Sequence, residues 1–157
     1  MERGDADWPT PTSAATTTVM VANQWRDTRP EIAVRSILHR RGRRFRKRFT
    51  IRLGGGRWTQ PDVVFLRERV TVFIDGCFWH SCPDHGTTPR HNTDYWSAKL
   101  RRNIARDRDT EIKLRNLGWT VIRAWEHEPP LRIADRVDAA VMLARDQATD
   151  ALLLRPR

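Results

Sequence analysis

One stretch constrains this chain more than any other: Val70 to His85, with the sequence VTVFIDGCFWHSCPDH. Its first half is a short apolar run of β-forming residues, which predicts a buried strand ended by Asp75 and Gly76. Residues 77–85 then contain both cysteines of the chain, two of its five histidines and two adjacent aromatic residues. Because proteins usually present reactive groups at the ends of rigid elements, the stretch predicts a functional loop anchored on a sheet.

The charge of the chain narrows the class of partner. At 157 residues one domain is expected, and 29 Lys and Arg against 19 acidic residues give a net charge of +10. Between Ile32 and Pro61 there are ten basic residues and no acidic one. Such a cluster is either a solvated basic face or the electrostatic footprint of a nucleic-acid-binding protein, and its density favours the second interpretation.

Hydropathy, the N-terminus and the cysteine content indicate where in the cell the protein is expected. No run reaches the ~18–20 apolar residues of a membrane helix, and the acidic N-terminus does not resemble a secretory signal. Two cysteines do not make a disulfide framework, so we expect a cytoplasmic protein. Composition predicts a flexible leader over residues 1–27, a folded domain over 28–148 and a short tail over 149–157.

Periodicity predicts a mixed sheet flanked by helices, an α/β (α+β) fold. The expected order is helix, strand, strand, strand, helix, strand and a C-terminal helix: 30–41, 45–53, 62–66, 70–75, 94–117, 119–125 and an amphipathic segment after Pro129-Pro130. The second of these alternates apolar and basic residues, which predicts a half-buried strand with a basic outer face. Gly54-Gly55-Gly56 is expected to form a turn, and Asp94 to cap the long helix.

Two carboxylates are expected at the ends of paired strands. Asp62 begins one predicted strand and Asp75 ends the next. Together they could hold Mg²⁺, a hard cation that prefers oxygen ligands. The alternative is that each is an ordinary turn residue, a position that Asp often occupies.

The long predicted helix carries two polar residues, Asn103 and Asp107, on its apolar stripe. A carboxylate there requires a partner. That partner is either an arginine or an imidazole, and His80 in the loop is the natural candidate. An Asp–His pair would fix the imidazole tautomer and leave the other ring nitrogen to act as a base.

The loop also offers soft ligands for a metal. Cys77, Cys82 and His85 lie within nine residues, and His127 follows the strand predicted over 119–125. These four could form a tetrahedral zinc site, although the spacing is looser than usual and the cysteines could be two ordinary thiols. Phe78, Trp79 and Trp96 could pack as core residues or wedge between DNA base steps.

Three segments together resemble the very short patch repair (Vsr) endonuclease family of bacterial DNA mismatch nicking enzymes. They are Asp75-Gly-Cys-Phe-Trp-His80, the NIARD stretch 103–107, and Leu117-Gly-Trp119 with Trp125-Glu126. The resemblance covers about Thr28 to Glu128. It implies a restriction-endonuclease-like αβββαβ core, in agreement with the predicted order of elements.

The resemblance also implies roles for individual residues. Asp62 corresponds to the central metal-binding aspartate and the main-chain carbonyl of Ile74 to a second Mg²⁺ contact, while Glu31 joins the metal and water network. His80 corresponds to the water-activating histidine, with Asp107 behind it. The residues that correspond to the structural zinc ligands are Cys77, Cys82, His85 and His127. The residues that correspond to DNA-contacting aromatics are Phe78, Trp79 and Trp96. We add four further candidates for DNA contact: Asn103, Lys99, Arg46 and Arg48. Some members have His in place of Asp75, which leaves open whether Asp75 joins the Mg²⁺ site.

The implied reaction is Mg²⁺-dependent nicking of double-stranded DNA 5′ to the thymine of a T·G mismatch, which arises by deamination of 5-methylcytosine. A cytosine-5 DNA methyltransferase is then the expected functional companion, with mismatch-repair proteins as possible partners of a monomeric, nucleoid-associated bacterial enzyme. Two alternatives stay open. One is a homing-type or stand-alone nicking endonuclease acting on matched DNA, and the other is a zinc-stabilised DNA-binding module without catalysis.

Overall fold

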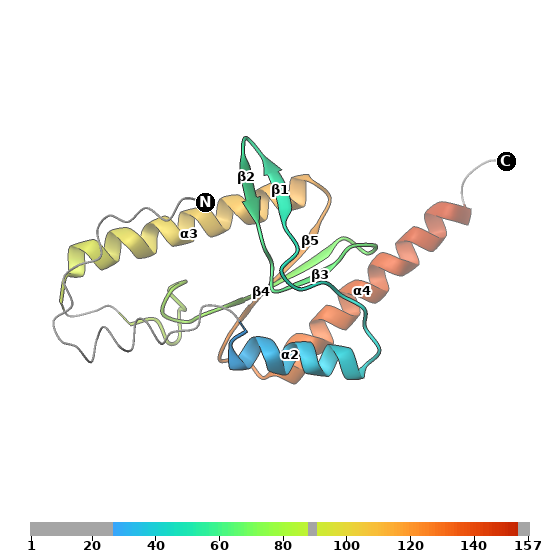
Figure 1. Cartoon of the computed structure of the whole chain (residues 1–157), viewed down its shortest axis with the longest axis horizontal. Helices are drawn as coiled ribbons and strands as arrows, with labels where there is room; N and C mark the ends of the chain where they lie inside the picture. The colour runs from blue at the N-terminus through green and yellow to red at the C-terminus, as the bar shows by residue number, and fades with distance from the viewer. Residues whose placement is uncertain (1–26, 88–90, 154–157) are drawn as a thin grey trace.

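The computed structural model describes residues 27–87 and 91–153, and the predicted leader lies almost wholly outside this part of the chain (Figure 1). The elements are α2 (Arg29–Arg40), β1 (Ile51–Gly54), β2 (Arg57–Thr59), β3 (Val63–Phe65), β4 (Val70–Asp75), α3 (Thr93–Asn116), β5 (Thr120–Trp125) and α4 (Pro130–Leu153). The predicted order of elements is confirmed, with one additional strand, β2.

A mixed sheet in the order β3-β4-β5 forms the centre of the molecule. β3 and β4 pair antiparallel, with Val63 opposite Val72, and the short turn 66–69 joins them. β4 and β5 pair parallel, with Ile74 opposite Ala124, and α3 makes the crossover between them. β4 is therefore paired on both edges, which accounts for its nearly continuous apolar sequence.

Helices cover both faces of this sheet. On one face α2 and α4 pack together, and the core there includes Val34, Leu38, Val72, Ile133 and Val137. On the other face, α3 and the β1-β2 hairpin enclose a second cluster of Ile51, Leu53, Val64, Leu114 and Val121. The amphipathic segment predicted after Pro129-Pro130 is confirmed as α4, whose apolar side packs in the first of these cores.

The single strand predicted over 45–53 is wrong in its first half. Arg46 pairs with Val64 as an isolated bridge, Arg48 adopts a left-handed backbone conformation (φ 58°), and only then does β1 begin at Ile51. A left-handed residue interrupts a strand ladder, so the chain bends away from β3 into a separate hairpin. Phe49, one of the apolar residues of the alternating pattern, is consequently exposed.

The β1-β2 hairpin depends on three glycines. Gly54, Gly55 and Gly56 all have positive φ angles, of 83°, 57° and 74°, which only glycine adopts readily in succession. This confirms the predicted turn. The strand after it, β2, was not predicted, because three residues are too few to show an alternating pattern.

The ends of α2 and α3 lie within one or two residues of the predicted ends. α2 and α3 end before Gly42 and Gly118, both with positive φ. At the other end of α3 the prediction of Asp94 as N-cap is wrong. The helix begins at Thr93, so Asp94 lies within the first turn, where a negative charge still complements the helix dipole.

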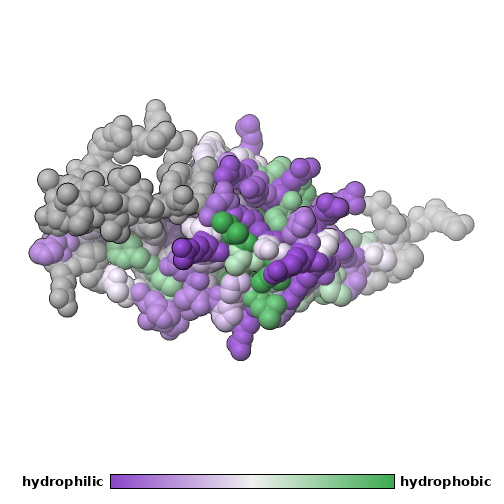
Figure 2. Space-filling view, turned by 60° about the horizontal axis from the view of Figure 1, so that its bottom comes forward, coloured by the Kyte–Doolittle hydropathy of each residue, from purple (hydrophilic) through white to green (hydrophobic). Residues whose placement is uncertain are grey.

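Hydrophilic side chains dominate the surface on the α2 side of the molecule, with small hydrophobic patches between them (Figure 2). Within the residues described, no helix is long and apolar enough to cross a membrane.

Candidate active site and metal centre

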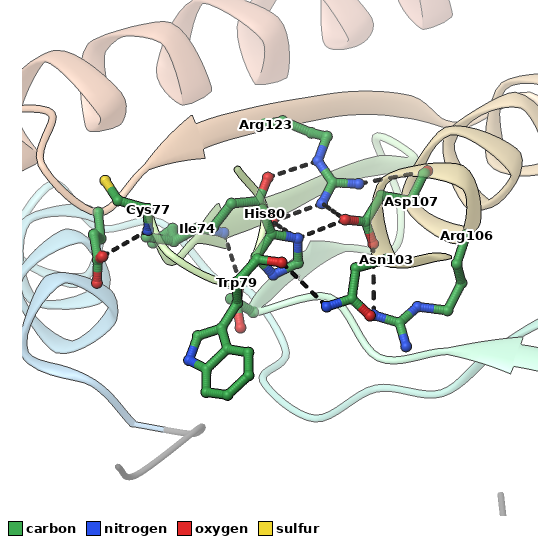
Figure 3. A network of polar contacts seen from close by, with 11 residues as sticks. Ile74, Cys77, Trp79, His80, Asn103, Arg106, Asp107 and Arg123 are labelled. Carbon is green, nitrogen blue, oxygen red and sulfur yellow. Dashed lines mark hydrogen bonds and ion pairs between the residues drawn. The ribbon is translucent and has the colours of Figure 1, made fainter. Parts of the chain in front are cut away.

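The loop after β4 is held against α3 by its own polar groups. The His80 ring nitrogen Nδ1 lies 2.5 Å from Asp107 Oδ2, and Asn103 donates from Nδ2 to the carbonyl of Trp79 at 3.1 Å. Figure 3 shows the His80 ring pointing toward Asp107, on the side of α3 that faces the loop. The structure therefore brings His80 and Asp107 together, as the polar residues on the stripe of α3 suggested.

The partner of His80 determines its tautomer. Desolvation alone would raise the pKa of Asp107. The hydrogen bond with His80 and the charges of Arg123 and Arg106 outweigh that effect and hold the pKa of Asp107 below its usual value. An ionised carboxylate can only accept, so Nδ1 of His80 carries a proton, and in the neutral imidazole the lone pair is on Nε2. The His80 side chain is 24% exposed, which allows a water molecule to reach it.

Asp62 lies at the entrance to β3, where its carboxylate faces the end of β4. Oδ2 accepts a hydrogen bond of 2.7 Å from the main-chain N–H of Ile74. Burial raises the pKa of Asp62 to about 7, and the negative charges of Glu31 and Asp75 act in the same direction. A buried carboxylate beside other acids is a suitable ligand for a hard cation, which would restore its charged form.

Glu31 lies on the same small cavity as Asp62, a space of about 40 Å³ that Arg35 and Arg48 also line. The Glu31 side chain is almost fully buried and accepts hydrogen bonds from Thr28 Oγ1 at 3.0 Å and from Arg35 at 3.2 Å. These donors fix the carboxylate at the start of α2, where a negative charge is favoured by the helix dipole.

Arg123, on β5, is a site residue that the sequence patterns did not identify. Its guanidinium donates to both carboxylate oxygens of Asp75, at 2.6 and 2.7 Å, and lies 3.5 Å from Asp107 Oδ2 (Figure 3). A signal was present, because Arg123 interrupts an apolar strand run. The structure thus engages both oxygens of Asp75 with Arg123, and the Asp75 carboxylate also lies 3.6 Å from His80 Nδ1.

The four soft ligands converge. The ligand atoms of Cys77, Cys82, His85 and His127 all lie within 4.8 Å of one another. Burial and the neighbouring Cys82 raise the pKa of Cys77 to about 11, so a nearby positive charge is needed to hold the pair as thiolates. Two sulfur and two imidazole donors at this separation can hold a metal ion.

The aromatic residues form a cluster at the start of α3. The ring centroid of Phe78 lies 5.0 Å from that of Trp79 and 5.5 Å from that of Trp96. Trp96 is buried, whereas Phe78 and Trp79 are half-buried. The ammonium group of Lys99 lies between 5.4 and 5.7 Å from the ring centroids of Tyr95, Trp96 and Trp79.

Two further residues expected to contact DNA lie on the segment before β1. Arg46 pairs with Val64 through its backbone and is exposed, and Arg48 forms an ion pair of 2.6 Å with Asp27. Of these two basic residues, Arg48 lines the cavity at Asp62.

The sequence of the chain is similar to those of known DNA-nicking enzymes. The family model described as DNA mismatch endonuclease Vsr matches residues 10–84. The type II nicking enzyme V.NaeI of Lentzea aerocolonigenes is 51% identical over 134 residues, which are 85% of this chain and 79% of the relative. The chain belongs to the Vsr family.

Other Vsr relatives are more distant. The type II nicking enzyme V.NmeAIP of Neisseria meningitidis is 39% identical, over 70% of this chain and 76% of the relative. The DNA mismatch endonuclease Vsr of Escherichia coli K12 is 34% identical, over 64% of this chain and 62% of the relative. Membership of the Vsr family makes the chain a DNA nicking endonuclease, a hydrolase, and its mixed α/β architecture is consistent with a restriction-endonuclease-like fold.

Proposed function

We propose that this Vsr-family endonuclease nicks double-stranded DNA 5′ to the thymine of a T·G mismatch, in a reaction that depends on Mg²⁺. The observation that carries the proposal is the His80–Asp107 pair just after β4, with the buried carboxylate of Asp62 hydrogen-bonded to the end of the same strand. A base and an acidic cation site at the end of one strand suit hydrolysis of a phosphodiester.

In the proposed mechanism, His80 Nε2 accepts a proton from the attacking water. Asp107 keeps the imidazole in the required tautomer and stabilises the imidazolium that forms. Asp62 and the main-chain carbonyl of Ile74 would hold Mg²⁺, and Glu31 would orient water beside it. The bound cation would polarise the scissile phosphate and stabilise its developing charge. Attack of the water on phosphorus breaks the bond to the 3′ oxygen, which leaves and takes a proton from solvent. The product is a nick with a 3′-hydroxyl and a 5′-phosphate.

Selection of a mismatch is assigned to the aromatic cluster. Phe78 and Trp79 are half-buried at the loop surface, where they could wedge beside a weakened base pair, and Trp96 supports them from α3. We further propose that the T·G substrate arises from deaminated 5-methylcytosine. A cytosine-5 methyltransferase is then a functional companion, and the monomeric enzyme hands its nick to mismatch-repair proteins.

A second candidate is nicking of fully matched DNA. It is favoured by the names of several relatives, which describe type II nicking enzymes and do not mention a mismatch. The site chemistry would be the same, and the aromatic cluster would then serve in packing or general DNA binding.

A nicking assay on two labelled duplexes separates these candidates. With Mg²⁺, we expect the wild type to nick a T·G duplex at least about tenfold faster than the same duplex with a T·A pair, because unstacking a base costs a few kcal/mol and costs least where the base is mispaired. Several methylation-site contexts should be tried. Equal nicking of both duplexes would reject mismatch specificity in favour of the second candidate.

We also propose that the Cys77, Cys82, His85 and His127 cluster binds a structural Zn²⁺. The support is the donor set itself, two thiols and two imidazoles on the loop and on the segment after β5. An ion at this position would join residues about 50 apart in sequence and fix the loop that carries His80.

Metal analysis tests this proposal. The purified protein should contain one zinc per chain, and Cys82→Ser should lower the zinc content and reduce the melting temperature by on the order of 10 °C. A chelator should reproduce the loss, and Zn²⁺ but not Mg²⁺ should reverse it. His91→Ala, at an exposed histidine outside the cluster, is the matched control. A wild-type melting temperature in Cys82→Ser would contradict a structural role.

A further inference from the structure

The outer face of the β1-β2 hairpin has no part in the mechanism above. Trp58 on β2 is 43% exposed and lies directly opposite Arg52 on β1, which is also exposed. Residues opposite each other in an antiparallel pair project from the same face. Gln60 donates to Thr50 Oγ1 at 2.9 Å across the next position, so this face carries a tryptophan, an arginine and two smaller polar groups.

The hairpin is a fixed arm. Its inner face, with Ile51 and Leu53, packs in the cluster that includes Leu114 of α3. Arg57 at the start of β2 forms an ion pair with Asp109 of α3. In Figure 1 the two strands cross α3 and project beyond it, away from α2. The outer face is therefore held in one orientation by contacts on the other side of the ribbon.

This outer face is continuous with the proposed catalytic centre. β2 ends at Thr59, and only Gln60 and Pro61 separate it from Asp62. Gln60 and Arg48 line the small cavity at Asp62, and Gln60 also belongs to the outer face through its bond to Thr50. The outer face of the hairpin and the cavity at Asp62 therefore meet at Gln60.

The charge of the segment identifies the class of polymer. Residues 43–57 contain seven Lys and Arg and no acidic residue. Arg44, Arg46 and Arg52 are exposed and form no ion pair with any residue in 27–87 or 91–153. An exposed aromatic ring among unpaired guanidinium groups complements a phosphate backbone and the apolar edges of sugars and bases.

We propose that the β1-β2 hairpin is a DNA-binding ribbon that follows the duplex away from the scissile phosphate. Arg52 contacts a backbone phosphate, and Trp58 packs against sugar and base edges in the groove. A two-stranded ribbon fits the major groove, which is about 12 Å wide. This inference rests on the proposed placement of the scissile phosphate at Asp62.

The test is DNA binding by the full chain, measured by fluorescence anisotropy on a T·G duplex and on its matched T·A counterpart at several salt concentrations. Trp58→Ala and Arg52→Ala are compared with Leu143→Ala and Arg132→Ala, which alter exposed residues of α4. Thermal melts of all four variants establish that they are folded. Because Trp58 and Arg52 are exposed, both variants should fold.

We expect Trp58→Ala to weaken binding of both duplexes by about tenfold, the effect of one aromatic contact. Arg52→Ala should weaken binding and reduce the slope of log affinity against log salt by about 0.9, the effect of one lost phosphate contact. The α4 controls should bind as the wild type does. Wild-type affinity and slope in both hairpin variants would overturn the proposal, and would leave a protein partner as the occupant of this face. Failure of the mismatch proposal is a separate result, since it appears as equal nicking of the two duplexes by the wild type.

Discussion

Asp62→Asn should abolish nicking and at the same time stabilise the protein at pH 8. We expect a loss of activity of at least about 10³-fold, because the variant lacks the carboxylate proposed to hold Mg²⁺. The amide oxygen of Asn can still accept the hydrogen bond from the Ile74 N–H. The structural role of the side chain is therefore retained while its buried charge is removed.

The stabilisation depends on pH in a defined direction. The pKa of Asp62 is about 7 in the folded chain, against an ordinary value of 3.8. The folded chain therefore holds a proton that the unfolded chain releases between about pH 4 and pH 7. The free energy of unfolding of the wild type falls across that range, by at most about 4 kcal/mol. Below pH 4 both proteins are neutral at this position and the difference disappears.

Thermal melts in buffer without added Mg²⁺ measure this effect. At pH 8 the melting temperature of Asp62→Asn should exceed that of the wild type by about 5 °C or more, and the gap should close by pH 4. Adding Mg²⁺ should raise the melting temperature of the wild type only. Asp109→Asn is the matched control, because the ion pairs of Asp109 with Lys113 and Arg57 lower its pKa. A variant at position 62 that melts below the wild type at pH 8 would contradict the assignment.

His80→Ala should lower the nicking rate by about 10²–10⁴-fold, the usual contribution of a general base. Binding of the T·G duplex should change little, because the imidazole acts on water. A histidine substitution elsewhere, His39→Ala at the exposed end of α2, should leave the rate unchanged. The measurement is single-turnover nicking with the enzyme in excess over DNA.

The role of Asp107 follows from its contact with His80. If Asp107 acts only through the imidazole, Asp107→Asn should reduce the nicking rate when it is the only substitution. In a chain that already carries His80→Ala, it should cause little further loss. Independent, additive losses in the double variant would contradict a shared role.

The order of elements was predictable because its signals are local. Apolar runs marked β4 and β5, and Gly42 and Gly118 marked the helix ends. The break at Arg48 was not predicted, since the alternation of apolar and basic residues continued across it. The left-handed conformation of Arg48 accompanies the departure of the hairpin from β3 toward α3, and sequence alternation does not encode that tertiary path.

Part of the candidate site was predictable, namely the part where a single residue is out of place in its local pattern. A carboxylate on the apolar stripe of a helix required a partner and pointed to His80, and the structure places Asp107 against it. Arg123 was not found because its importance comes from pairing. Arg123 interrupts an apolar strand run, but only the parallel register of β4 and β5 brings it beside Asp75, and the sequence does not show that register.

The parallel pairing of β4 with β5 determines when the site residues can come together during synthesis and folding. A growing chain that has reached Asn116 already contains Asp62, His80 and Asp107, yet it lacks Arg123 and His127. Because parallel strands join only after the intervening helix has formed and the long connection has closed, this step belongs to the slow, late part of folding. The proposed catalytic centre is therefore complete only once β5 has joined the sheet, and a fragment of the chain that ends before β5 is expected not to nick DNA.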